Sequence, residues 1–245
     1  MENSVRTVIS VITPMLTTPE LSMLSQSNKK IQCLTKHALW SRRWWSYNDT
    51  IPRGALVLKY ISYGTCPSTT LYLKFDDDFN QPVKLPPKLI SVEFGFNFDK
   101  HVDLPRSLVS VKFGWRFNRL VELSPNLRDV EFGWNFDRPL TLPSKLNSVV
   151  FGATFNQTIL LPGGLKHVEF GWNFNQPLTL PDSLVSAKFG LSFNQNILLP
   201  NGLVSIMFER RFNQRVLWPT SLRLLRIFRG YTHPLPEGVN ISYVH

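Results

Sequence analysis

Cysteines and long hydrophobic runs are scarce in this chain. Only two cysteines, Cys33 and Cys66, occur in 245 residues, and they do not form a CxxC pair. A disulfide framework like those of small secreted domains is therefore excluded. The apolar stretch nearest the N-terminus, residues 8–16, follows an acidic residue instead of a basic segment and is too short to cross a bilayer. We expect a cytoplasmic protein without membrane contact.

Motifs that carry catalytic chemistry are also missing. The sequence has no HExxH, GxSxG, GxGxxG or P-loop spacing. Its five histidines, His37, His101, His167, His233 and His245, show no spacing typical of metal ligands. We expect no metal, no cofactor and no enzymatic activity.

The net charge of +10 is unevenly distributed. Residues 1–60 carry eight basic and three acidic side chains, whereas residues 61–222 carry sixteen and thirteen. Six arginines crowd near the C-terminal end: Arg210, Arg211, Arg215, Arg223, Arg226 and Arg229. Basic ends could bind phosphates, but the nearly neutral middle predicts no continuous basic groove. Nucleic-acid binding therefore ranks third among the functions considered below.

A repeat of 19 residues dominates the middle of the chain. Phenylalanine recurs at this spacing without an insertion, and a second aromatic column follows four residues after the first. The first column is Phe75, Phe94, Phe113, Phe132, Phe151, Phe170, Phe189 and Phe208. The second is Phe79, Phe98, Phe117, Phe136, Phe155, Phe174, Phe193 and Phe212.

One repeat reads LPRSLVSVKFGWRFNRLVE. The L-x-x-V-x-F spacing of Leu108, Val111 and Phe113 is typical of the strand of a leucine-rich repeat, in which alternate residues point inward. So short a repeat has no room for a helix on the return path. The return stretch should therefore be extended and should place Val102 and Leu104 inward.

The pattern continues into both flanks, where the repeats are shorter. Leu58 and Tyr60 fit the inward positions of a first strand, and Val239, Ser242 and Val244 fit those of a last one. The sequence therefore predicts a mainly β fold, namely a leucine-rich-repeat-like parallel β solenoid of about eleven short coils. We assign it to residues 51–245, after a small helical segment at residues 1–50.

An amide column follows the second phenylalanine of each repeat. Asparagine occupies it except where aspartate replaces it, and both residue types can accept backbone N–H bonds in a turn. Its members are Asn80, Asp99, Asn118, Asp137, Asn156, Asn175, Asn194 and Asn213. We predict a structural ladder between coils; the alternative is a ligand site.

A column of charged residues lies on the outward side of the predicted strands. It alternates in sign along its first half and contains Lys74, Glu93, Lys112, Glu131, Val150, Glu169, Lys188, Met207 and Arg226. Neighbours in this column should lie about 4.8 Å apart, which suits ion pairs. The column is either a solvated face or a charged recognition surface. In the second case Glu93, Lys112, Glu131, Glu169, Lys188 and Arg226 would contact a protein partner.

A column rich in tryptophan comes directly after the repeated glycine. It contains Phe96, Trp115, Trp134, Ala153, Trp172, Leu191 and Arg210. Alternation continued from the strand predicts that these side chains are buried. The alternative is an exposed aromatic stripe on which a ligand could stack.

The repeats resemble a known family. The run FGWNFNQPLTLPDSL at residues 170–184, and the related FDDDFNQPVKLPPKL and FGWNFDRPLTLPSKL, are similar to FNIP repeats. FNIP repeats are relatives of leucine-rich repeats that are abundant in social amoebae and in the giant viruses that infect amoebae. The resemblance covers about residues 70–225.

In that family an F-box often precedes the repeats, and residues 18–40 resemble its later part. Thr18 or Thr17 as a cap, Pro19 in the first turn and Glu20 near the helix N-terminus independently predict a helix start. The opening Leu-Pro segment of an F-box is missing. The resemblance implies a helical hairpin that contacts the adaptor subunit of a cullin-type ubiquitin ligase through Pro19, Leu21, Leu24, Ile31, Leu34, Leu39 and Trp40. The alternative is a helical cap that only shields the first coil.

Three functions follow from these patterns. The first is a substrate-recognition adaptor of a ubiquitin ligase, and the second is a structural, virion or general interaction protein. The third is nucleic-acid binding through the basic ends. We also predict self-association through the C-terminal edge of the sheet, because an unpaired edge strand can pair with another copy.

Overall fold

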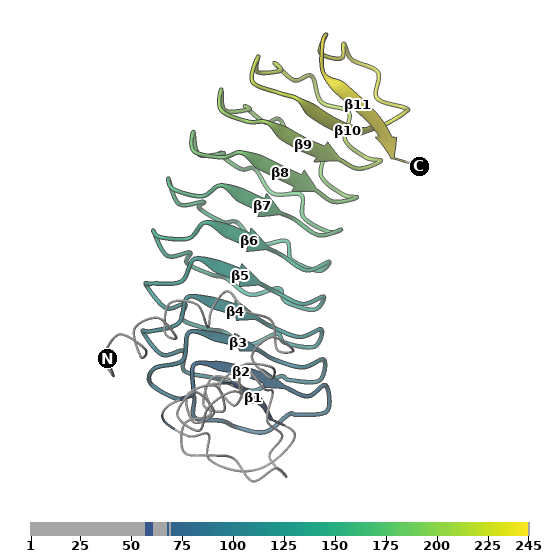
Figure 1. Ribbon diagram of the computed structural model, residues 1–245. Coiled ribbons are helices and arrows are strands. Elements are labelled where there is room, and N and C mark those ends of the chain that lie inside the picture. Colours follow the sequence, from purple (N-terminus) through teal and green to yellow (C-terminus); the bar gives the residue numbers. More distant parts are fainter. Residues whose placement is uncertain (1–56, 61–67, 69, 245) are drawn as a thin grey trace, which may run out of the picture.

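The coordinates are a computed structural model that describes residues 57–60, 68 and 70–244. The helical segment predicted at residues 1–50 lies outside the described residues. Eleven short strands occur in the described part of the chain, and they form one parallel sheet in sequence order (Figure 1). The predicted parallel β solenoid is therefore confirmed.

The strands are three to five residues long, one in each coil. They are β1 (Val57–Tyr60), β2 (Tyr72–Phe75), β3 (Ser91–Glu93), β4 (Ser110–Lys112), β5 (Asp129–Glu131), β6 (Ser148–Val150), β7 (His167–Glu169), β8 (Ser186–Phe189), β9 (Ser205–Phe208), β10 (Leu224–Phe228) and β11 (Asn240–Val244).

Two tight turns close each coil. At the start of β4, the backbone N–H of Leu108 donates to the carbonyl of Pro105 at 3.0 Å. After the strand, the N–H of Phe117 donates to the carbonyl of Gly114 at 3.3 Å. Proline suits the first turn because its carbonyl accepts this bond and its missing N–H is not needed there. The return stretch between the turns contains no helix in any described coil.

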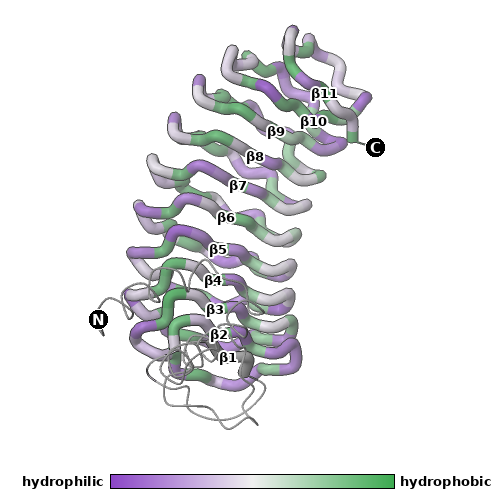
Figure 2. Tube along the Cα trace, viewed as in Figure 1, coloured by the Kyte–Doolittle hydropathy of each residue, from purple (hydrophilic) through white to green (hydrophobic). Residues whose placement is uncertain are grey.

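The two phenylalanine columns fill the interior. Every ring in them is at most 4% exposed. Within a coil the two ring centroids lie 3.7 to 4.4 Å apart, and the rings are stacked. Leucine and valine from the strand and return stretch complete the same core. Each coil thus carries both hydrophobic and hydrophilic segments (Figure 2).

Neighbouring coils are closer on the strand side than on the return side. Equivalent rings of the column that follows the strand are 5.2 to 5.8 Å apart. Those of the column nearer the return stretch are 6.0 to 6.1 Å apart. The outward side of the strands is therefore the concave side of the stack.

The predicted burial of the tryptophan column is wrong. Phe96, Trp115 and Trp172 are 41%, 42% and 56% exposed, and Trp134 is partly exposed. Alternation needs an extended backbone, but the chain turns directly after the glycine of each coil. The side chain that returns to the core is that of the next phenylalanine, such as Phe117, and the two residues between the glycine and this phenylalanine, such as Trp115 and Arg116, point outward.

The predicted register of the last strand is also wrong. Ile241 and Tyr243 align with Leu225 and Ile227, so the strand is shifted by one residue from the expected alignment of Ser242 and Val244. Val244 is nevertheless buried as predicted, whereas Tyr243 is 42% exposed. The turn before this strand contains Gly238, which has a φ of 68° and is the one residue with positive φ among the described residues.

Candidate binding surfaces

The outward side of the strands forms a concave, polar surface, here called the strand face. From β3 to β9 one of its columns is serine except at Asp129 and His167, and the exposed Tyr72 and Leu224 flank this run. Nδ1 of His167 lies 2.8 Å from Oγ of Ser186 in the next coil. No helix covers this face in the described part of the chain. The small side chains leave the concave sheet open to a partner.

The charged column on the strand face is organised as pairs. Lys74 binds Glu93 at 2.6 Å, Lys112 binds Glu131 at 2.7 Å, and Lys188 binds Glu169. Each pair joins neighbouring coils, and the side chains are about half exposed. Pairs of this kind contribute little stability, about 0.2 to 1 kcal/mol each. Their main effect is to neutralise the surface and keep the side chains ordered.

The middle of the column is uncharged. Val150 aligns with Glu131 on one side and Glu169 on the other. Each glutamate is paired with the lysine on its far side from Val150, namely Lys112 and Lys188. At the C-terminal end, Arg226 aligns with Met207. All six residues predicted to contact a partner therefore lie in one column on the strand face.

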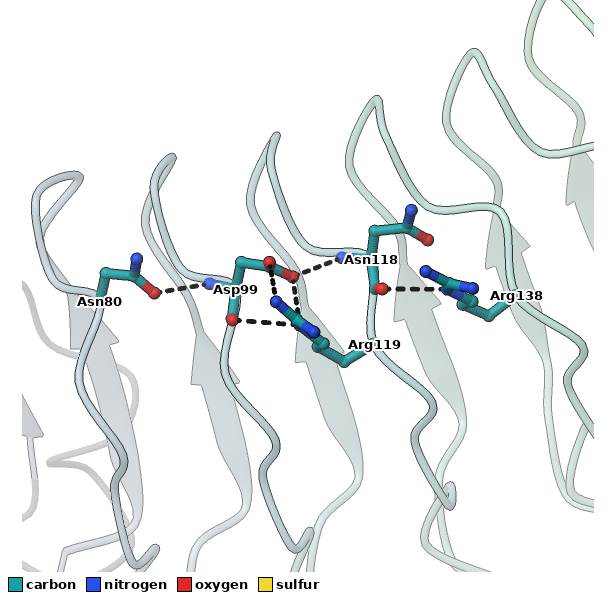
Figure 3. A network of polar contacts seen from close by, with 5 residues as sticks. All are labelled: Asn80, Asp99, Asn118, Arg119 and Arg138. Atoms are coloured by element: carbon teal, nitrogen blue, oxygen red, sulfur yellow. Dashed lines mark hydrogen bonds and ion pairs between the residues drawn. The ribbon is translucent and has the colours of Figure 1, made fainter.

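The amide column forms a continuous hydrogen-bonded ladder. The backbone N–H of Asp99 donates to Oδ1 of Asn80 at 2.9 Å, and that of Asn118 donates to Oδ1 of Asp99 at 3.0 Å (Figure 3). The same bond recurs at 2.9 to 3.1 Å through Asn213. Thr232 takes the last place and donates to Asn213. The side chains thus satisfy backbone donors and are not free for a ligand.

Arg119 gives the ladder an ionic contact at one position. It donates to both carboxylate oxygens of Asp99, at 3.1 and 2.7 Å (Figure 3). Partial burial raises the pKa of Asp99, but hydrogen bonds from Arg119 and from the Asn118 backbone, together with the charges of Arg119 and Lys100, outweigh it. The net result is a pKa below the ordinary value.

We expect Asp99→Ala to destabilise the protein by about 1 to 3 kcal/mol, because the N–H of Asn118 loses its acceptor. Asp99→Asn is the matched control, since asparagine fills the equivalent place in neighbouring coils and keeps the oxygen acceptor. Urea unfolding of both variants measures the difference. Equal losses would show that the ladder acceptor has no stabilising effect.

The lowered pKa of Asp99 also predicts a pH dependence. A depressed folded-state pKa stabilises the protein above the unfolded-state pKa, and this stabilisation is lost as the pH falls through the folded-state value. Below about pH 4 the wild type should therefore lose more stability than Asp99→Asn, which has no carboxylate at this position. Urea unfolding between pH 7 and 3 tests this, and parallel curves would contradict it.

The tryptophan column forms a raised line of rings, here called the aromatic ridge and defined by Phe96, Trp115, Trp134 and Trp172. Phe96 and Trp115 stack with centroids 5.5 Å apart, and Trp115 and Trp134 stack at 4.5 Å. Trp172 meets Trp134 edge-on at 4.8 Å, across the buried Ala153. Phe96, Trp115 and Trp134 therefore cover parts of one another's faces, whereas Trp172 is not stacked on a neighbour and is the most exposed ring.

The return face is apolar toward its C-terminal half. Leu160, Leu198 and Leu217 are 89%, 82% and 79% exposed there. Grooves of about 1060 Å³ and 650 Å³ open along this face, the first lined from His101 to Thr158 and the second from Leu178 to Leu217. Alternation along the extended return stretch could have identified these leucines, since each lies between two inward positions.

Other kinds of site find no support in the described residues. No group of three histidine, cysteine, aspartate or glutamate side chains there could hold a metal ion. The same part of the chain has no helix that is long and apolar enough to cross a membrane. The residues predicted to contact a cullin adaptor, from Pro19 to Trp40, lie outside the described residues.

Comparisons with known proteins agree with the repeat and the fold. No curated protein matches the chain. Among solved structures it is similar to that of CroV588, described as a novel circular LRR protein, with a TM-score of 0.67 and 32% sequence identity. The match covers 81% of this chain but spans only 35% of the CroV588 chain. The model of the FNIP repeat matches residues 155–192, so this part of the solenoid is similar to FNIP repeats and the whole is a leucine-rich-repeat-like fold.

Proposed function

We propose that the protein is a non-enzymatic interaction module that binds another protein on its strand face. The observation that carries this proposal is the concave, uncovered sheet surface, on which three lysine–glutamate pairs join neighbouring coils. A surface of serines, paired ions and a central Val150 can bury against a protein with little unpaired charge.

Nucleic-acid binding has weaker support on this face. The three lysines of its charged column are each paired with a glutamate, so the column offers phosphates little net attraction. The aromatic ridge does not compensate, because three of its four rings stack on one another and leave few faces for bases.

Site-specific crosslinking tests the strand face directly. A photoreactive amino acid in place of Ser148 should capture a protein partner in lysate of cells that make this protein. The matched control carries the same residue in place of Thr179, on the exposed return face. Capture from Thr179 alone, or of the same proteins equally from both positions, would contradict the proposed site.

A more specific proposal is that the bound protein is a ubiquitination substrate and that residues 1–50 recruit a cullin adaptor in the cytoplasm. Its support is the resemblance of residues 18–40 to an F-box. The strand face would then hold the target while other subunits transfer ubiquitin. The alternative remains a structural or general interaction protein in which residues 1–50 cap the first coil.

Point variants in the full chain separate these alternatives. Leu24→Asp and Leu34→Asp should abolish capture of the purified adaptor subunit, while the unfolding transition of the repeats remains unchanged. Arg6→Asp, which lies outside the resemblance, is the control. If the wild type fails to bind the adaptor, the ligase proposal is wrong, and the strand-face proposal still stands on its crosslinking test.

A further inference from the structure

The aromatic ridge lies between charged ends of opposite sign. Its line of positions begins with the exposed Asp77 in the coil of β2 and ends with the exposed Arg210 and Arg229 in the coils of β9 and β10. The neighbouring column runs in the same sense, from Asp78 to Arg211. The ridge is thus acidic at one end, aromatic in the middle and basic at the other end.

This order is self-complementary when two ridges run antiparallel. In such a pair, a twofold axis passes between the coils of Trp134 and Ala153. Each position of one copy then faces the position of the other copy that lies equally far from the axis on the opposite side. Asp77 then faces Arg210, Phe96 faces Leu191, Trp115 faces Trp172, and Trp134 faces Ala153. In the neighbouring column, Asp78 faces Arg211, Asn97 faces Ser192, Arg116 faces Asn173, and Asn135 faces Thr154.

Three chemical features of this pairing favour association. Opposite charges meet at both ends, because a twofold axis repeats every contact. A large indole meets the smallest side chain of the column, and the remaining central contacts join aromatic or aliphatic groups. No like charges face each other, since the lone central arginine, Arg116, faces Asn173.

The exposed ring edges provide the driving force. Phe96, Trp115 and Trp172 expose about half of their surface, although aromatic residues are normally buried or used at interfaces. Because Phe96, Trp115 and Trp134 stack on one another, a small stacking ligand gains little at these three rings. A second apolar surface of the same length covers all the edges at once.

We propose that the aromatic ridge is an interface between two copies of this chain, packed antiparallel about a twofold axis. Eight coils at about 4.8 Å spacing and a width of about 15 Å give roughly 500 Å² on each copy. That area lies below the ~800 Å² per partner of a standard stable complex, so the dimer should be weak and should dissociate on dilution. The strand face remains open in such a dimer, and the inference does not depend on the proposed function.

Charge reversal tests the interface with the full chain. Sedimentation velocity should show concentration-dependent dimers of the wild type. Asp78→Lys and Arg211→Glu should each weaken dimerisation by at least about tenfold, because the twofold axis creates two like-charge contacts in either variant. Asp78 is exposed, and its carboxylate accepts one solvent-exposed side-chain hydrogen bond, from Asn97 at 3.2 Å, so replacing Asp78 should not unfold the coil.

An equimolar mixture of the two variants provides the decisive measurement. In a heterodimer the new lysine at position 78 faces the new glutamate at position 211, and the remaining aspartate faces the remaining arginine. Heterodimers should therefore form with nearly wild-type affinity. Lys166→Glu, an equal charge change at an exposed site outside the ridge, is the control and should leave dimerisation unchanged.

Three outcomes would overturn the proposal. The first is a strictly monomeric wild type, and the second is a dimer that neither reversal weakens. The third is a dimer that the reversals weaken but the mixture does not restore. Pairing through the edge of β11 instead predicts no response to either variant.

Discussion

A Gly133→Ala variant is expected to lose about 3 to 5 kcal/mol of folding free energy. A Cβ atom at this position would lie 2.0 Å from the carbonyl oxygen of Gly114 and 2.8 Å from Cα of Trp115. Both are backbone atoms of the preceding coil, so neither can rotate away as a flexible side chain could. The two coils would have to separate, and the backbone hydrogen bond from Asn135 to Trp115, now 2.9 Å, would stretch with them.

Gly163→Ala is the matched control for this prediction. No atom lies within 4 Å of the Cβ that alanine would add there, and the φ angle is not positive. Alanine should therefore be neutral or stabilise by about 0.4 to 1 kcal/mol, because it reduces the freedom of the unfolded chain. Urea unfolding of both variants distinguishes close coil packing from a general effect of glycine. Similar free energies for the two would contradict the role of the glycine column.

The same contact explains why the 19-residue period is so regular. Gly95, Gly114, Gly133, Gly152, Gly171 and Gly190 each approach the carbonyl group one coil earlier, at 1.8 to 2.2 Å from the position a Cβ would take. An insertion in one coil would displace this contact and the asparagine ladder together. Coil length is therefore constrained at two places along this side of the solenoid.

Most of the fold could be predicted from the sequence because the spacing of inward-pointing side chains recurs from one 19-residue repeat to the next. The spacing of Phe94, Phe98 and Val92 identifies the inward side chains of a coil without any knowledge of its neighbours, and all three are buried. Parallel order then follows from the short coil, since each strand can pair only with the strands before and after it. The FNIP-like pattern gives the same answer for residues 155–192.

The predictions from the sequence were wrong where a turn interrupts the regular alternation of inward and outward side chains. Trp115 follows a strand in sequence but lies in a turn, and alternation gives no signal of where extended backbone ends. The one-residue shift of β11 follows a shortened coil that contains the left-handed Gly238, and a glycine alone does not reveal its φ angle. The first error reverses which side chain faces the core, whereas the second changes the alignment with β10 and leaves Val244 buried.

The candidate site was predictable in part. The column of Glu93, Lys112 and Glu131 could be placed on one face from the period alone, but the pairing pattern could not. Lys112 has a glutamate on either side and forms its ion pair with Glu131. Which neighbour is chosen depends on side-chain rotamers that the repeat does not encode. The aromatic ridge was identified as a column, but its complementarity with itself becomes visible only once its side chains are known to be exposed.

A Phe136→Ala variant should be destabilised by about 3 to 5 kcal/mol, which corresponds to a fall in Tm of about 6 to 20 °C. Phe136 is fully buried, and its ring stacks 4.0 Å from Phe132 and 6.1 Å from both Phe117 and Phe155. Its loss would leave a cavity in the middle of an otherwise unbroken column. Each coil contacts only its neighbours, so no other contacts join the coils before the cavity to the coils after it. These two parts of the solenoid should therefore unfold less cooperatively than in the wild type.

Leu198→Ala is the control for burial, because it also shortens a large apolar side chain but at a position that is 82% exposed. We expect it to change stability by less than about 0.5 kcal/mol. Phe136→Leu adds an intermediate case, in which most of the volume is kept and about 1.5 kcal/mol or less is lost. Thermal and urea unfolding should place the loss for Phe136→Leu between those of the other two variants. A Phe136→Ala variant as stable as Leu198→Ala would mean that the stacked phenylalanine columns do not hold the coils together.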